Sequence, residues 1–255
     1  MSRTTAAPRN GAVSRAGAAS RDGAAPRDGA APRGTVLMDL DGTISDPKSG
    51  LFASFRASLQ KVGHAWPDER PLDWIIGPPL RQSFMTVLGD ETLAAAALAH
   101  YRVVYGGGAM FDNVLYPGMV EAITALGASG FRLFVATSKL TAFAERIVAN
   151  FDLAGRFVRV YGSTADGRFE NKADIVALCL AEETIDPTRC VMVGDRKHDV
   201  LAAAAHAVPC IGVAWGYGGI EELRAAGAAS ICEAPSGLRD TVEQVLGDCK
   251  PSTSA

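Results

Sequence analysis

Two aspartates stand two residues apart at the end of an apolar run. The stretch VLMDLDGTISD, residues 36 to 46, places Asp39 and Asp41 directly after three apolar residues. Carboxylates so placed can hold a metal ion, attack an electrophile, transfer a proton or cap a turn. Taken alone, Asp39 is explained as well by a cap as by catalysis. The chemistry therefore depends on which other side chains the fold brings beside it.

Polar residues recur in three further clusters: TSK at 137 to 139, the pair Asn171 and Lys172, and GDRKHD at 194 to 199. The first and third follow apolar runs, and the pair opens a helical pattern. In a parallel sheet such positions lie along one edge, so we expect the clusters to meet in one cleft.

Each cluster also has an ordinary structural explanation. Thr137 or Ser138 suits the N-cap of a following helix, Lys172 suits a solvated helix face, and Asp195 with Asp199 suits an exposed acidic face. These explanations weaken if all the clusters share one edge, because gathered like charges repel unless a cation or a substrate group balances them.

The elements that would position these residues alternate along the chain. Continuous apolar runs rich in branched residues predict strands buried on both faces, and segments such as 118 to 130 and 171 to 183 have helical spacing. The predicted strands are VLMDL (36–40), FRLFVA (131–136), FVRVYGS (157–163), CVMVG (190–194) and CIGVAW (210–215). This order predicts an α/β fold, a doubly wound, Rossmann-like parallel sheet.

One interval is too long for a simple crossover. Residues 48 to 115 contain three helical patterns and no convincing strand, which predicts a small helical cap domain over the strand ends. A six-residue repeat of Pro, Arg, Gly and Ala precedes the first strand and predicts disorder. The expected organisation is a disordered tail (1–34), a core (35–47 and 116–247), a helical cap (48–115) and a flexible C-terminus (248–255).

The expected site has oxygen ligands and no sulfur. Asp39, Asp41 and Asp195, with Asp199 near them, favour Mg²⁺, which carboxylates hold together with water and substrate phosphate. A calcium-binding EF-hand loop is excluded because Asp41 is followed at once by Gly42, without the later acids that such a loop needs.

Phosphoryl transfer would use every member of this set. Asp39 could attack phosphorus, and Asp41 could protonate the leaving oxygen and later take a proton from water. The hydroxyl of Thr137 and the ammonium group of Lys172 would hold the phosphoryl oxygens, and Asp195 would complete the metal site.

The chain after residue 35 resembles the haloacid dehalogenase superfamily. Its four motifs occur in order as DLDGT (39–43), a strand ending in Thr137, Lys172 at a helix start, and GDRKHD (194–199). The resemblance implies Asp39 as nucleophile, Asp41 as acid/base whose main-chain carbonyl also binds Mg²⁺, and Asp195 as metal ligand supported by Asp199. Thr137, Ser138 and Lys172 are then the phosphate-binding residues.

The resemblance narrows further within the superfamily. True dehalogenases lack an acid at the Asp41 position and ion-pumping ATPases carry DKTGT, so both are disfavoured. The expected cap, the segment GPPLRQSF (77–84) and the segment GVAWGYGGIEELRAAGA (212–228) are similar to phosphoglycolate phosphatases and 5′-nucleotidases.

Two cationic residues are candidates for recognising the leaving group. Arg81 follows a Gly-Pro-Pro turn that would present it to the cleft, although packing over the cap explains it as well. Lys139 adjoins the phosphate-binding residues. His198 suits a helix surface, because a Mg²⁺ site has little use for imidazole.

Composition excludes several other classes of function. The 255 residues include 25 Lys and Arg against 28 Asp and Glu, so charge gives no argument for a nucleic acid polymer or an anionic membrane as partner. With no apolar run long enough to span a bilayer and no signal sequence, we expect a cytoplasmic monomer or homodimer. The 5 cysteines include no C-x-x-C pair, which predicts reduced thiols.

The leading hypothesis is a Mg²⁺-dependent phosphatase acting on a small phosphate ester, with phosphoglycolate as the first candidate. A 5′-nucleotidase or a sugar-phosphate phosphatase is the alternative, and a dedicated biosynthetic pathway could employ any of them. A phosphomutase would return the phosphoryl group to its substrate. A non-catalytic phosphate-binding protein is disfavoured, because binding alone would not require Asp41.

Overall fold

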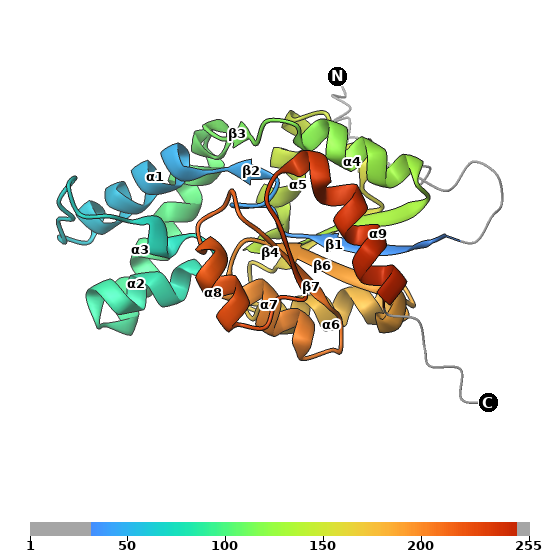
Figure 1. Cartoon of the computed structure of the whole chain (residues 1–255). Coiled ribbons are helices and arrows are strands. Elements are labelled where there is room, and N and C mark those ends of the chain that lie inside the picture. Colours follow the sequence, from blue (N-terminus) through green and yellow to red (C-terminus); the bar gives the residue numbers. More distant parts are fainter. Residues whose placement is uncertain (1–31, 249–255) are drawn as a thin grey trace, which may run out of the picture.

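A six-stranded sheet forms the centre of the molecule in the computed structural model, which describes residues 32–248 (Figure 1). The strands are β1 (Gly34–Met38), β4 (Phe131–Leu140), β5 (Arg159–Ser163), β6 (Cys190–Gly194), β7 (Cys210–Val213) and β8 (Ser230–Cys232). Their order is β5-β4-β1-β6-β7-β8, and every neighbouring pair is parallel. The expected doubly wound α/β fold is confirmed.

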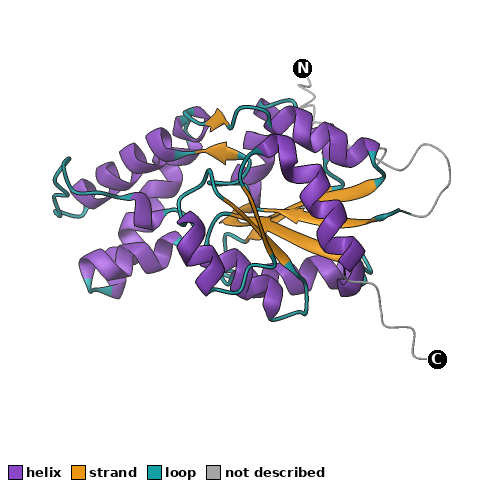
Figure 2. Cartoon of the chain, in the orientation of Figure 1, coloured by secondary structure: helices purple, strands orange, loops and turns teal. Residues whose placement is uncertain are grey.

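Helices cover both faces of the sheet, as Figure 2 shows. One face packs against α4 (Met119–Ala128), α5 (Thr141–Asn150) and α9 (Leu238–Asp248), and the other against α6 (Lys172–Glu182), α7 (Lys197–Ala204) and α8 (Gly219–Ala225). In the view of Figure 1, α6, α7 and α8 lie below the sheet.

Successive side chains of a strand enter opposite layers. In β1, Val36 and Met38 join the core beneath α4 and α9, while Leu37 joins the core beneath α6 and α7, and all three are fully buried. Because both faces are covered, the strand must be apolar at every position, which explains its uninterrupted apolar run.

A helical insertion, which we define as residues 48–115, extends to the left of the sheet in Figure 1. It contains α1 (Lys48–Lys61), α2 (Leu80–Leu88) and α3 (Glu91–Gly106), with short 3₁₀ turns at Asp73–Ile75 and Ala109–Phe111. The chain enters and leaves through a two-stranded antiparallel pair, β2 (Ser45–Asp46) and β3 (Val114–Leu115).

Aromatic rings run from the insertion into the core. Phe55 stacks on Phe84 with 4.4 Å between ring centroids, and Tyr101 stacks on Tyr105 at 5.0 Å. Tyr105 then meets Phe143 of α5 edge-on at 5.6 Å. The insertion and the layer of α4, α5 and α9 therefore share one continuous apolar core.

Several sequence expectations differ in detail from the structure. The strands β2, β3 and β8 were not predicted, and β4 continues to Leu140 past the expected end, with an irregularity after Ala136. Within residues 32–248 the four cysteines are buried and form no disulfide with one another: Cys179, Cys190, Cys210 and Cys232. The repeat region through residue 31 and Cys249 lie outside the described residues.

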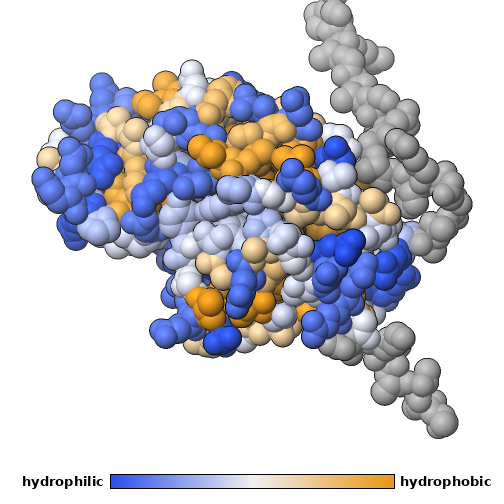
Figure 3. Space-filling model, turned by 45° about the horizontal axis from the view of Figure 1, so that its top comes forward, coloured by the Kyte–Doolittle hydropathy of each residue, from blue (hydrophilic) through white to orange (hydrophobic). Residues whose placement is uncertain are grey.

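The described surface is mixed in character. Hydrophilic and hydrophobic residues intermingle on the face drawn in Figure 3. Among residues 32–248, no helix combines the length and the apolar character needed to cross a membrane.

We expect Phe84→Ala to destabilise the protein strongly. Phe84 is fully buried between the rings of Phe55 and Tyr101, so truncation leaves a cavity that costs about 3–5 kcal/mol. Urea denaturation followed by circular dichroism measures this loss. Val103→Ala is the matched control, since Val103 is 72% exposed and its truncation should change stability by less than about 0.5 kcal/mol. Equal effects of the two substitutions would contradict the shared core.

Candidate active site

The carboxyl ends of three adjacent strands bring the polar clusters together. Met38, the last residue of β1, pairs in register with Val135 of β4 on one side and Val193 of β6 on the other. The residues that follow are Asp39 on β1, Ala136 and Thr137 on β4, and Gly194 and Asp195 after β6, so Asp39, Thr137 and Asp195 lie at the same edge of the sheet. The expected convergence at one sheet edge is what the structure shows.

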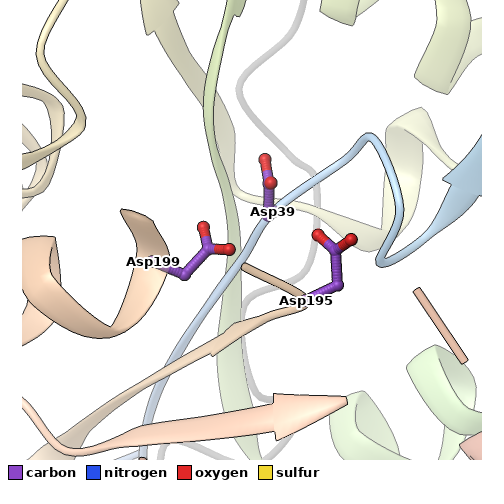
Figure 4. A group of neighbouring side chains, drawn as sticks. All are labelled: Asp39, Asp195 and Asp199. Atoms are coloured by element: carbon purple, nitrogen blue, oxygen red, sulfur yellow. The ribbon is translucent and has the colours of Figure 1, made fainter. Parts of the chain in front are cut away.

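Three buried carboxylates form the centre of the site. Asp39, Asp195 and Asp199 each offer an oxygen atom, and these oxygens all lie within 4.8 Å of one another. Figure 4 shows the three side chains around a common space: Asp39 follows β1, Asp195 follows β6, and Asp199 lies in the first turn of α7. None of the three is more than 2% exposed.

Backbone amides hold each carboxylate in place. Asp39 accepts a hydrogen bond from the Leu40 N–H at 2.7 Å, and Asp195 accepts one from the Tyr217 N–H at 2.7 Å. Asp199 accepts from the Arg196 N–H at 3.0 Å in the first turn of α7, where a negative charge is favourable. The orientation of every carboxylate is thus set by main chain.

Lys172 is the positive charge among these acids. Its ammonium nitrogen lies 2.7 Å from Asp39 Oδ2 and also bonds Asp199. Burial alone would lower the pKa of Lys172, but the two carboxylates prevail and raise it, so the residue stays charged. Lys172 is the first residue of α6, where a cation is unfavourable, so the acids must offset that cost.

The third acid, Asp195, takes part in no ion pair found among residues 32–248. Burial raises the pKa of Asp195 well above its ordinary value, and the negative charges of Asp199 and Asp39 raise it further. Ionising all three acids together is therefore unfavourable unless a cation joins them.

A hard divalent cation fits this set of donors. All the gathered groups are carboxylate oxygens, which Mg²⁺ prefers. The backbone leaves room for the Asp195 carboxylate, since Gly42 has φ +86° and a Cβ there would lie 2.2 Å from Asp195 Oδ2. Any side chain at position 42 would displace that carboxylate, so the glycine after Asp41 is required by the close approach.

Asp41 occupies a different environment from the three clustered acids. Its Oδ2 lies 2.9 Å from the ammonium group of Lys139, whose nitrogen also donates to the Tyr105 hydroxyl at 2.6 Å. Its Oδ1 is buried and has no hydrogen-bond donor among the described residues. Burial raises the pKa of Asp41 although Lys139 opposes this, which favours a carboxyl group able to carry a proton.

A cleft between the insertion and the sheet edge exposes this chemistry. Asp39, Asp41, Thr137, Ser138 and Lys139 line its floor, and Leu51, Ile75, Leu98, Tyr101, Tyr105 and Phe143 supply apolar and aromatic walls. A second opening adjoins it on the side of α6 and α7, with Lys172, Asn171 and His198 in its lining.

A family model described as haloacid dehalogenase-like hydrolase matches residues 36–213. The chain belongs to this family. The match covers β1 through β7 and therefore every acid of the cluster.

Several curated members of this family are similar over most of the chain. A 5′-nucleotidase of Pseudomonas aeruginosa is 38% identical over 82% of this chain and 95% of its own length. The tyrosine-protein kinase PtkA of Mycobacterium tuberculosis is 38% identical over 72% of this chain, which spans 62% of that protein. A phosphoglycolate phosphatase of Colwellia psychrerythraea is 28% identical over 83% of this chain and 94% of its own length.

A solved structure of a haloacid dehalogenase-like fold agrees with the arrangement. A predicted phosphatase from Clostridium acetobutylicum superimposes with a TM-score of 0.80 at 36% identity, covering 84% of this chain and 100% of the other.

The two expected specificity residues of this family member are differently placed. Arg81 lines the cleft at the start of α2, but its guanidinium pairs with Glu91 at 2.5 Å and is partly exposed. Lys139 is buried and bonded to Asp41 and Tyr105. The ammonium group of Lys139 therefore binds Asp41 and Tyr105 and does not present an uncompensated charge to a leaving group.

Three residues beside the site escaped sequence reasoning. Tyr105 reaches Lys139 from α3, Tyr217 supplies the amide for Asp195, and Arg196 joins the acids to the insertion. Tyr217 lies in the WGYGG string, which already resembled the family, so that signal was available. Tyr105 lies among apolar residues of a helical pattern, where nothing marks it as special.

We expect Asp195→Asn to reverse the cost of this buried charge. Because its pKa is raised on folding, the folded state favours protonated Asp195, so its contribution to stability is full below its ordinary pKa and is lost as the group ionises with pH rising through the raised value. Without metal, the stability of the variant minus that of wild type should therefore be larger at pH 8 than at pH 5. Mg²⁺ should raise the melting temperature of wild type by several degrees and leave the variant unchanged.

Differential scanning fluorimetry in EDTA and in MgCl₂ measures both effects. Asp240→Asn is the control, since this exposed acid pairs with Arg239 on α9, and it should behave as wild type. An undiminished Mg²⁺ response in Asp195→Asn would refute this account of the cluster.

Proposed function

We propose that this chain, a phosphatase of the haloacid dehalogenase-like family, hydrolyses a small phosphate monoester with Mg²⁺ through an aspartyl-phosphate on Asp39. The observation that carries the proposal is that two acids with different surroundings line one cleft. Asp39 lies against Lys172, whereas Asp41 has a raised pKa and one buried oxygen without a donor among the described residues.

In the first step, a carboxylate oxygen of Asp39 attacks phosphorus while the bond to the leaving oxygen breaks. Asp41 donates its proton to that oxygen, which leaves as an alcohol. Thr137 and Ser138 donate to the phosphoryl oxygens from the irregular part of β4 after Ala136, and the charge of Lys172 stabilises these oxygens. Lys139 keeps Asp41 in position through the contact at 2.9 Å.

In the second step, Asp41 is ionised and takes a proton from a water molecule, whose oxygen attacks phosphorus. The bond to Asp39 breaks, inorganic phosphate leaves, and both acids return to their starting states. Asp39, the main-chain carbonyl of Asp41 and Asp195 would hold Mg²⁺, and Asp199 would support them through Lys172 and the Arg196 amide. Bound Mg²⁺ would neutralise charge on the phosphoryl group.

The walls of the cleft support a leaving group larger than glycolate. Leu98, Ile75 and Phe143 offer apolar surface in the lining of the cleft. A nucleoside would use that surface, and a relative 38% identical is named 5′-nucleotidase. We therefore propose a nucleoside 5′-monophosphate as the preferred substrate class, ahead of the phosphoglycolate expected from sequence.

Phosphoglycolate is the second candidate because one cation in the cleft could bind its carboxylate. Arg102 lines the cleft and donates to the Ala165 carbonyl at 3.1 Å, but takes part in no ion pair found among residues 32–248. By contrast, the charge of Lys139 is compensated by Asp41 and that of Arg81 by Glu91.

We expect Asp39→Asn to reduce the rate of phosphate release by several orders of magnitude, because the nucleophile is lost. Asp41→Asn should reduce turnover by about 10²–10⁴-fold, the usual contribution of a general acid/base. Release of phosphate from p-nitrophenyl phosphate in MgCl₂ measures both. Asp240→Asn is again the control and should match wild type. Full activity of Asp39→Asn would exclude the covalent route.

A substrate panel should separate the two leaving groups. We expect kcat/KM for AMP and UMP to exceed that for 2-phosphoglycolate by about tenfold or more, the discrimination that apolar contacts provide. Arg102→Met decides the alternative: if phosphoglycolate is the substrate, this variant should lose activity on it and keep activity on p-nitrophenyl phosphate. Isomerised sugar phosphate without released phosphate would instead indicate a phosphomutase.

A further inference from the structure

Arg196 connects the acidic cluster to the insertion. Its main chain contacts the cluster, and its side chain contacts the insertion. Its N–H bonds Asp199 at 3.0 Å, so its backbone is part of the acidic cluster. Its guanidinium NH1 donates to the main-chain carbonyl of Ile76, 120 residues away, and Nε donates to Glu222 at 2.9 Å. The residue is 9% exposed, and its charge is compensated by a partly buried carboxylate.

The segment that Arg196 grips is short and stiff. Gly77 follows Ile76 with φ +106°, and a Cβ at this position would lie 3.0 Å from Arg196 Cγ. Pro78 and Pro79 come next, and Pro79 is the N-cap of α2. Because proline fixes its own φ, displacement at Ile76 is transmitted along the segment rather than absorbed.

This segment, residues 76–81, separates the two openings of the site. Gly77, Pro79 and Arg81 line the main cleft above Asp39 and Asp41, and the same three residues line the adjoining opening beside α6 and α7. The position of the segment therefore sets the width of both openings at once.

Glu222 binds the Arg196 side chain on the side of the core. Its Oε1 accepts from the Arg196 side chain and from the Lys197 N–H, both at 2.9 Å. Glu222 therefore orients the guanidinium group from the core, and the same group donates to Ile76 of the insertion. A lysine at this position would keep the charge but lack the rigid fork that serves both partners.

We propose that Arg196 is a positioning residue that fixes segment 76–81 against the core and so determines which leaving groups the cleft accepts. This inference rests on the proposed phosphatase function of the same site. Arg196 touches no reacting atom in this role; its main chain supports Asp199, while its side chain selects substrate by holding the partition between the two openings.

Two variants test the contact, one from the core and one from the insertion, and a third variant is the control. Arg196→Lys removes the fork, and Gly77→Ala pushes on the same contact from the insertion, far in sequence from the catalytic acids. Arg132→Lys is the matched control, because Arg132 bonds the carbonyl and the carboxylate of Glu183 entirely within the core.

Hydrogen exchange of the substrate-free protein gives the first readout. The amides of Ile76, Gln82 and Ser83 donate to backbone carbonyls, so they report opening of the segment. We expect their exchange to accelerate about tenfold in Arg196→Lys and in Gly77→Ala, as loss of a charged hydrogen bond implies, and to stay unchanged in Arg132→Lys.

Steady-state kinetics with AMP and p-nitrophenyl phosphate gives the second readout. In both test variants KM for AMP should rise about tenfold while kcat changes by less than about twofold, since positioning, not chemistry, is altered. Unchanged exchange in Arg196→Lys, or faster exchange with an unchanged ratio of the two KM values, would overturn the proposal. Failure of the phosphatase assignment is distinct, because wild type would then hydrolyse neither compound.

Discussion

Lys172 lies between the carboxylates of Asp39 and Asp199 in a space that solvent barely reaches. Desolvating these charges costs several kcal/mol for each ion unless partners compensate, so their placement constrains everything around them. The acids need backbone amides, the lysine needs two acids, and Asp195 still needs a cation. A fold that meets these demands must bring four chain segments together with little freedom.

The parallel sheet satisfies this constraint through register. Because β1 is paired on both sides, the residues after Met38, Ala136 and Gly194 are fixed relative to each other by backbone hydrogen bonds. The direct bond from the Asp39 N–H to the Val193 carbonyl at 2.9 Å continues that ladder to the site itself. The acids are consequently held by the most rigid part of the molecule, as catalysis by fixed charges requires.

The local part of this arrangement was predictable and the rest was not. Strand β1 follows from its apolar run, and Lys172 follows from Asn171, which caps α6 by accepting from the Ala173 N–H. Each is a signal within a few residues. The bonds from Lys139 to Tyr105 and from Arg196 to Ile76 span 34 and 120 residues and depend on how the insertion packs. Strands as short as β2 and β3 arise from that packing as well.

The predictable contacts and the unpredictable contacts also lie in different parts of the site. The acids that we propose to act on phosphorus are fixed by main-chain register at the end of the sheet. The contacts between the core and the insertion beside the cleft include single side-chain bonds, from Lys139 to Tyr105 and from Arg196 to Ile76. A single side-chain bond can be replaced at a cost of a few kcal/mol without disturbing the ladder beneath it. Substrate choice can therefore change at this edge while the phosphoryl chemistry stays the same.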